Sequence, residues 1–198
     1  INISPFSGSV VKASDYDNDG DMDIFVGGRH VPHQYPLPAS SMLLINENGK
    51  LVNKTQNLAI EFENVGMVTD AIWNDYDADG DLDLTLVGEW MPVTFFNNEE
   101  GALKKTAMEG LEDTSGWWYS LEKGDFDGDG DMDFIAGNLG LNYKYKTSKE
   151  TPFDIYYNDF DVNGKNDIVL GYYNNNKHYP LRGFSCSSEQ IPVLKEEI

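Results

Sequence analysis

Aspartate residues are crowded into short segments of this chain, and the first is DYDNDGDMD, from Asp15 to Asp23. It places five carboxylates in nine residues without a lysine or arginine. Because neighbouring like charges repel and raise each other's pKa, such a segment indicates a cation held among the carboxylates. Acids at positions 1, 3, 5 and 9 with glycine at position 6 have the ligand spacing of a calcium loop, in which position 7 contributes its backbone carbonyl.

The same pattern returns three times, as DYDADGDLD, DFDGDGDMD and DFDVNGKND. The candidate metal ligands are positions 1, 3, 5, 7 and 9 of the four loops: Asp15, Asp17, Asp19, Asp21, Asp23, Asp75, Asp77, Asp79, Asp81, Asp83, Asp125, Asp127, Asp129, Asp131, Asp133, Asp159, Asp161, Asn163, Lys165 and Asp167. Three loops carry the full set of acids and predict Ca²⁺ sites. The fourth has Asn163 at position 5 and Lys165 at position 7, so we expect a fourth, weaker site there.

The negative charge of the chain is local. The four loops hold 18 acidic residues and one lysine, so they carry 17 of the 20 net negative charges. Bound divalent ions would neutralise about half of this charge, whereas acidity that only aids solubility would be spread over the surface. A nucleic-acid partner is not expected, because the chain has no basic patch to contact phosphates.

The flanks of the loops indicate strands instead of the helices of an EF-hand. Position 12, which is usually an acid in an EF-hand, is apolar in all four loops: Val26, Leu86, Ala136 and Leu170. Short β-branched and aromatic runs that end in glycine follow each loop, such as IFVGG and LTLVG. Each loop is therefore predicted to join two neighbouring strands, with the metal ion holding the turn.

Two further segments, 41–55 and 92–106, read as strand pairs with glycine-containing tips. Together with the loops, they predict an all-β fold, a β-propeller segment of about three to four four-stranded blades. The approximate blade limits are 1–60, 61–114 and 115–198, and we expect a fragment of a larger propeller. The fourth loop either lies between the last two strands of the third blade or opens a fourth. Residues 186–198 have a helical pattern.

The Asp loops followed by glycine resemble the FG-GAP/VCBS repeats of integrin-alpha-like β-propellers. Longer segments, including VGEWMPVTFFNN and the stretch GNLGLN at 137–142, are similar to bacterial surface proteins of the cartilage acidic protein and ASPIC/UnbV family. The resemblance implies a calcium-stabilised propeller that is secreted, on the cell surface or periplasmic, with ligand roles at the loop positions named above. It brings no catalytic residues.

No arrangement of residues predicts catalysis, so we expect a non-enzymatic module. The favoured function is a calcium-dependent binding or scaffold domain whose exposed face meets a protein or a glycan. Two alternatives stay open: a lectin-like carbohydrate binder, in which Trp90, Trp117 and Trp118 could stack on sugars, and an accessory part of a secreted polysaccharide-degrading enzyme. His30 and His33 read as exposed, and Cys186 reads as packed or incidental. The chain has no apolar run long enough to predict a transmembrane segment.

Overall fold

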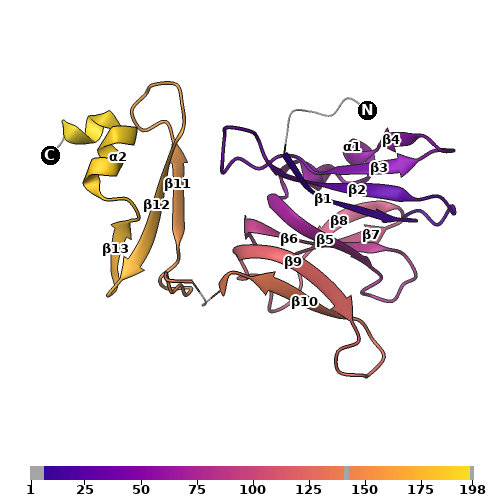
Figure 1. Ribbon diagram of the computed structural model, residues 1–198. Helices are drawn as coiled ribbons and strands as arrows, with labels where there is room; N and C mark the ends of the chain where they lie inside the picture. Colours follow the sequence, from indigo (N-terminus) through magenta and orange to yellow (C-terminus); the bar gives the residue numbers. More distant parts are fainter. Residues whose placement is uncertain (1–6, 141–142, 197–198) are drawn as a thin grey trace. The chain divides into compact units, whose positions relative to one another are not determined.

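The computed structural model describes residues 7–140 and 143–196. The chain divides into two compact units, Ile1–Gly140 and Leu141–Ile198. Both are built from antiparallel strands, as Figure 1 shows. Each of the four Asp loops joins two strands that pair with each other, which confirms the hairpin prediction.

The first sheet is a four-stranded antiparallel meander. Its strands, in the order of the sheet and of the chain, are β1 (Ser7–Ser14), β2 (Asp23–His30), β3 (Met42–Asn46) and β4 (Leu51–Asn53). Two short helical segments follow it, α1 (Thr55–Leu58) and η1 (Ile60–Asn64).

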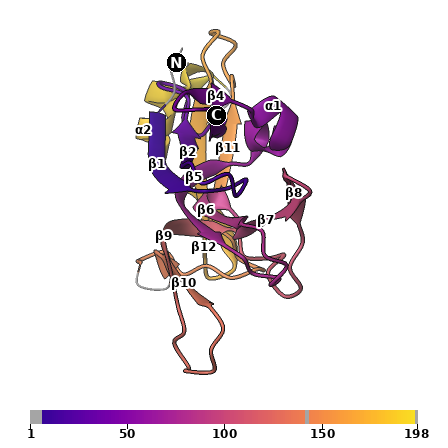
Figure 2. The same cartoon turned by 90° about the vertical axis from the view of Figure 1, so that its right-hand side faces the viewer.

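The second sheet repeats this meander and continues into a further hairpin. Its members are β5 (Met67–Asn74), β6 (Asp83–Met91), β7 (Thr94–Glu99), β8 (Ala102–Thr106), β9 (Gly116–Gly124) and β10 (Asp133–Asn138). Strand β9 pairs with β10 along most of its length. Its first residues also pair with the last residues of β6, Trp117 with Glu89 and Gly116 with Met91. Figure 2 shows the loop between β9 and β10 extending beyond the ends of these two strands.

The tips of the third and fourth strands in both meanders have the backbone that the sequence predicts. Asn48 and Gly49 have φ angles of 55° and 82°, and Glu100 and Gly101 have φ angles of 54° and 82°. Two consecutive residues with positive φ are characteristic of the type I′ turn, whose twist suits a two-residue hairpin. Glycine at the second position avoids the steric cost that a side chain would meet there.

The main core lies between the two meanders. Phe62 of η1 is fully buried and stands edge-on to Phe25 of β2 and to Phe96 of β7, with ring centroids 5.3 Å and 4.9 Å away. Edge-to-face contacts between aromatic rings add to the gain from burying their apolar area. The short helical connection therefore fills the space between one four-stranded sheet and the next.

Side chains, instead of a continuous hydrogen-bonded ladder, connect β1, β5 and β9, the first strands of the hairpins that hold the first three Asp loops. Asp70 of β5 forms an ion pair of 2.9 Å with Lys12 of β1 and accepts the backbone N–H of Leu121 of β9 at 2.9 Å. The hydroxyl of Ser9 donates to the carbonyl of Val68 at 2.5 Å, and the hydroxyl of Thr69 lies 2.7 Å from the carbonyl of Trp118. These contacts join β1 to β5 and β5 to β9 in the same way.

The second unit is a smaller antiparallel sheet followed by helical turns. Its elements are β11 (Asp154–Asn158), β12 (Asp167–Asn174), β13 (Lys177–Pro180), α2 (Phe184–Gln190) and η3 (Pro192–Lys195). The fourth Asp loop joins β11 to β12, and these strands belong to a different sheet from β9 and β10. The helical pattern expected from residue 186 corresponds to α2 and η3, while residues 197–198 lie outside the described residues.

The fold is thus all-β, with antiparallel meanders, repeated loop hairpins and repeated contacts between first strands. These features agree with the predicted β-propeller segment. The limits of the individual blades, 1–60, 61–114 and 115–198, stay a prediction. Of the stretch GNLGLN, residues 141–142 lie outside the described part of the chain.

Candidate metal-binding loops

All four loops have the same backbone course between their strands. Position 4 has a positive φ in every loop: 58° at Asn18, 60° at Ala78, 81° at Gly128 and 56° at Val162. The glycine at position 6 also has a positive φ, between 84° and 102°. These two left-handed residues turn the chain sharply, so that the odd-numbered side chains are carried around one centre.

Hydrogen bonds from the backbone fix the carboxylates at each end of the loops. In the first loop, the N–H of Gly20 donates to Oδ2 of Asp15 at 3.1 Å, and the N–H of Tyr16 donates to Oδ2 of Asp23 at 3.0 Å. The equivalent pairs occur in the other three loops, between 2.9 Å and 3.3 Å. The first and last acids of each loop are therefore held in place before any ion is considered.

The position 7 N–H donates to the side chain at position 5 in each loop. Asp21 donates to Asp19 at 2.9 Å, and Lys165 donates to Asn163 at the same distance. Because its N–H points toward position 5, position 7 is fixed through its backbone, and neither Asp21 nor Lys165 needs its side chain for this contact. This agrees with a predicted ligand role for position 7 through its carbonyl.

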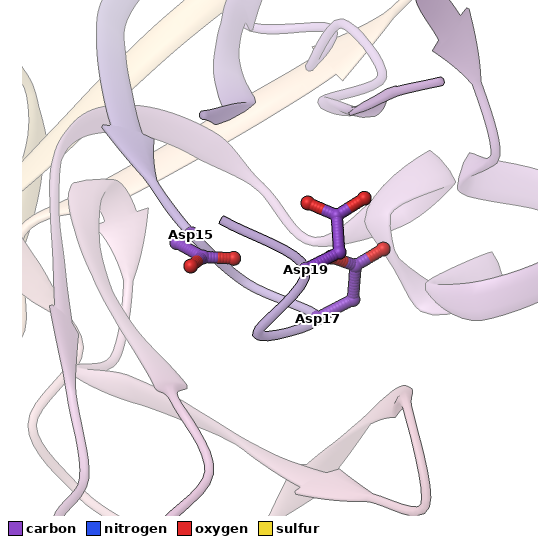
Figure 3. A group of neighbouring side chains, drawn as sticks. All are labelled: Asp15, Asp17 and Asp19. Atoms are coloured by element: carbon purple, nitrogen blue, oxygen red, sulfur yellow. The ribbon is translucent and has the colours of Figure 1, made fainter. Parts of the chain in front are cut away.

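Each loop brings three carboxylates together. Their oxygens lie within 4.8 Å of one another in four groups: Asp15, Asp17 and Asp19; Asp75, Asp77 and Asp83; Asp125, Asp127 and Asp133; and Asp159, Asp161 and Asp167. Figure 3 shows the first group extending from a single loop. All four groups could hold a metal ion. The predicted ligands outside these groups are Asp21, Asp23, Asp79, Asp81, Asp129, Asp131, Asn163 and Lys165.

Two of these carboxylates have a buried oxygen that would suit a bound cation. Within the described residues, Oδ1 of Asp15 and Oδ1 of Asp161 are buried and accept no hydrogen bond. An ionised carboxylate oxygen removed from water without a donor is costly, and a bound cation would remove that cost. The donor set consists of oxygens alone, which suits a hard cation such as Ca²⁺ better than zinc or copper.

The electrostatics of the first two loops point the same way. Partial desolvation, together with the charges of Asp23 and Asp19, raises the pKa of Asp17. Burial also raises the pKa of Asp83, although the N–H groups of Asn98 and Tyr76 partly offset the effect. A raised pKa means that the charged form of the carboxyl group is disfavoured by burial and by the neighbouring acids. A bound cation would stabilise that charged form.

The first and second loops also approach each other. The side-chain amide of Asn18 lies 3.5 Å from Oδ1 of Asp81. Tyr16 is buried beside both loops, and its pKa is raised by burial and by the charges of Asp17 and Asp81. The negative charge of the first loop and that of the second loop therefore act on the same buried side chain.

The sequence analysis missed one structural contact of the loops. In the first two sheets, the carboxylate at position 9 also accepts a backbone N–H from the strand pair that follows: Asp23 from Asn46, and Asp83 from Asn98, both at 2.8 Å. The side chains of these asparagines in turn accept the N–H of the hairpin glycine three residues later, Gly49 or Gly101. The repeated Asn-x-x-Gly in NENG and NEEG was the signal available in the sequence.

The comparison with protein families agrees with this repeat geometry. A model described as FG-GAP-like repeat matches residues 15–86 and again residues 75–136. The chain belongs to the FG-GAP-like repeat family. Each FG-GAP match begins at the first aspartate of one loop and ends in the strand after the next loop. The fourth loop, 159–167, lies outside both matches.

No curated protein matches the chain. In residues 7–140 and 143–196, none of the helices combines the length and the apolar character that a bilayer crossing requires.

Proposed function

We propose that the chain is a calcium-binding β-propeller module that acts outside the cytoplasm as a non-catalytic binding or scaffold domain. The observation that carries the proposal is the repeated carboxylate triad, with its unpaired buried oxygens on Asp15 and Asp161. All twenty candidate positions named from the sequence are proposed as ligands or supports of four sites, with position 7 acting through its carbonyl.

Calcium has a structural role in this proposal. Each loop closes a hairpin, and position 9 anchors the first two loops to the following strands. An ion in the loop therefore stabilises a whole sheet. The extracellular or periplasmic location is proposed because loops of this kind are suited to the higher calcium concentrations found there. The relation to ASPIC/UnbV proteins is likewise a proposal and rests on the sequence segments alone.

Titration calorimetry with Ca²⁺ and, separately, Mg²⁺ tests the metal assignment. We expect three to four sites with a clear preference for Ca²⁺, because magnesium demands a small, regular octahedral shell and gives up its water reluctantly. The variant Asp159→Ala should remove one site and leave the others unchanged. Equal affinity for Mg²⁺, or no binding at millimolar Ca²⁺, would contradict the proposal.

A further inference from the structure

A group of polar and aromatic side chains lies at the ends of β2 and β6 that are far from the Asp loops. Arg29 and Glu89 each stand six residues after the last aspartate of their loop, Asp23 or Asp83. At roughly 3.3 Å per residue, that places them about 20 Å along the strand from the loops. In Figure 1, the dark connection after β2 lies on the opposite side of the first unit from the β1–β2 loop.

An ion pair with a buried carboxylate forms the centre of this group. The carboxylate of Glu89, whose side chain is only 8% exposed, pairs with the guanidinium of Arg29, whose side chain is 41% exposed. The hydroxyl of Tyr35 lies 3.4 Å from the second carboxylate oxygen of Glu89. The same hydroxyl accepts the indole N–H of Trp90 at 2.7 Å. One charged pair, one phenol and one indole are therefore connected in a single network.

Trp90 has a backbone that a tryptophan rarely adopts. Its φ is 61°, and it lies where the register between β6 and β9 shifts, between Glu89 and Met91. A bulky residue in the left-handed region is strained, and such residues cluster at functional sites. The shift turns its ring toward Trp117 of β9, edge-to-face at 5.1 Å. Bulges of this kind redirect a side chain beside a site.

Tyr35 comes from a connection that the second sheet lacks. Eleven residues separate β2 from β3, whereas only two separate β6 from β7. Backbone hydrogen bonds give the connection a defined course. The N–H of Val31 donates to the carbonyl of Leu37 at 3.0 Å, and the N–H of Leu37 donates to the carbonyl of Gln34 at 2.7 Å. His30 and Pro38 also form an isolated antiparallel β-bridge. Because this ordered insertion places a phenol beside a buried carboxylate, we infer that it has a functional role in addition to joining the two strands.

We propose that this group, called here the strand-end cluster (Arg29, Tyr35, Glu89, Trp90 and Trp117), binds a neutral saccharide. The proposal rests on the binding role proposed above and names its ligand class. The partly exposed guanidinium of Arg29 offers donors beside the phenol of Tyr35, which can donate and accept, and this matches neighbouring sugar hydroxyls, since each of these can donate and accept. The indole rings offer apolar faces and edges for the C–H surface of a pyranose.

The charge balance of the cluster decides between neutral and charged ligands. An anionic ligand would compete with Glu89 for Arg29 and leave a buried carboxylate without its counter-charge, which is strongly unfavourable. A cationic ligand would compete with Arg29 for Glu89. A neutral polyol can instead hydrogen-bond to the exposed side of Arg29 and leave the pair intact.

An array of neutral and anionic oligosaccharides, probed in calcium-containing buffer, tests the inference, with titration of the strongest neutral binder afterwards. We expect neutral glycans to bind, and Tyr35→Phe and Arg29→Lys to weaken them at least tenfold. Tyr156→Phe, a matched change in the second unit, should leave affinity within twofold. Oxidation of Trp90 and Trp117 in the unchanged chain, followed by peptide mass spectrometry, should slow when the glycan is bound.

Binding of anionic glycans or peptides alone, no binding of neutral glycans, or unchanged oxidation of Trp90 and Trp117 would overturn the inference. Should the two cluster variants fail to fold, the oxidation experiment decides. The test is separable from the calcium proposal. A chelator that does not change the melting temperature while glycans still bind contradicts calcium alone, and a chelator effect without glycan binding contradicts the strand-end cluster alone.

Discussion

Asp23 connects more of the structure than its place at the end of the first Asp loop implies. It is 1% exposed, and its two oxygens accept the N–H groups of Tyr16 and Asn46. It therefore joins the loop to β3 as well as serving as a candidate ligand. Asp133, at the same position of the third loop, is half-buried and accepts the N–H of Phe126 at 2.9 Å.

Asp23→Asn should destabilise the protein more than Asp133→Asn. The new amide places an NH₂ group against a backbone N–H donor in a site closed to water, at a cost of about 2–3 kcal/mol. At Asp133, water can compensate, and the loss should stay under about 1 kcal/mol. Urea unfolding in EDTA measures both variants without the contribution of a bound ion. Equal losses would mean that the anchor to β3 carries little of the stability.

Val162 has an unfavourable backbone for its residue type. It occupies position 4 of the fourth loop with φ of 56°, and its side chain is 88% exposed. A β-branched side chain in the left-handed region is strained, and no burial of the valine offsets the strain.

Val162→Asn should stabilise the protein by about 1 kcal/mol, because asparagine adopts this region readily. Gly128→Val at the equivalent position of the third loop is the reciprocal change. A Cβ at Gly128 would meet nothing within 4 Å, so its effect reports the backbone alone and should be destabilising. Urea unfolding in calcium-containing buffer measures both changes. A destabilised Val162→Asn, or an unaffected Gly128→Val, would show that the loop backbone relaxes around the side chain.

At the scale of elements, the hairpins around the loops could be predicted because spacing and residue type both act locally. Odd-numbered acids, a glycine at position 6 and β-branched flanks specify turn and strands together, and β2, β6, β10 and β12 each begin at the last aspartate of a loop. The helical segment η1 could not be predicted in this way. Phe62 is held there by contacts with Phe25 and Phe96, which are distant in sequence.

The candidate sites were predictable in their residues but not in their detailed grouping. The first loop gathers its acids from positions 1, 3 and 5, whereas the other three use positions 1, 3 and 9. That difference depends on the side-chain orientation of each carboxylate, which its neighbours in space determine. The first three loops have the same residues at these positions, so the sequence could not predict the difference. The contact of Asn46 with Asp23 depends on the pairing of β2 with β3 in the same way.

The link between β5 and β9 gives a test at this scale. Thr69→Val keeps the shape of the side chain but removes the hydroxyl that reaches the carbonyl of Trp118 at 2.7 Å. We expect a loss of about 1–2 kcal/mol in urea unfolding, because the carbonyl loses a donor in a partly buried place. Thr147 is exposed in the second unit, so Thr147→Val is the matched control and should change stability by less than about 0.5 kcal/mol. Equal losses would mean that the two strands are held together by apolar packing.

For the molecule as a whole, the distribution of charge governs stability. Of 20 net negative charges, 17 fall in four loops that each close a hairpin, so repulsion acts directly on the turns of the fold. Four divalent ions would neutralise about half of it. Monovalent salt can screen these exposed charges over a Debye length of about 10 Å at 0.1 M, but it supplies no coordination shell for the loop oxygens.

Removal of calcium should therefore lower the melting temperature sharply. One ion at ten times its dissociation constant stabilises the native state by about 1.4 kcal/mol, and three to four such sites contribute about 4–6 kcal/mol, comparable with the net stability of a domain. Thermal unfolding with and without EDTA, each at low salt and at 0.5 M NaCl, separates coordination from screening. The difference between the curves should persist at high salt, and Mg²⁺ at the same concentration should restore little of it. A transition that EDTA leaves unmoved, or an EDTA effect that salt abolishes, would mean that the carboxylates act through their charge alone.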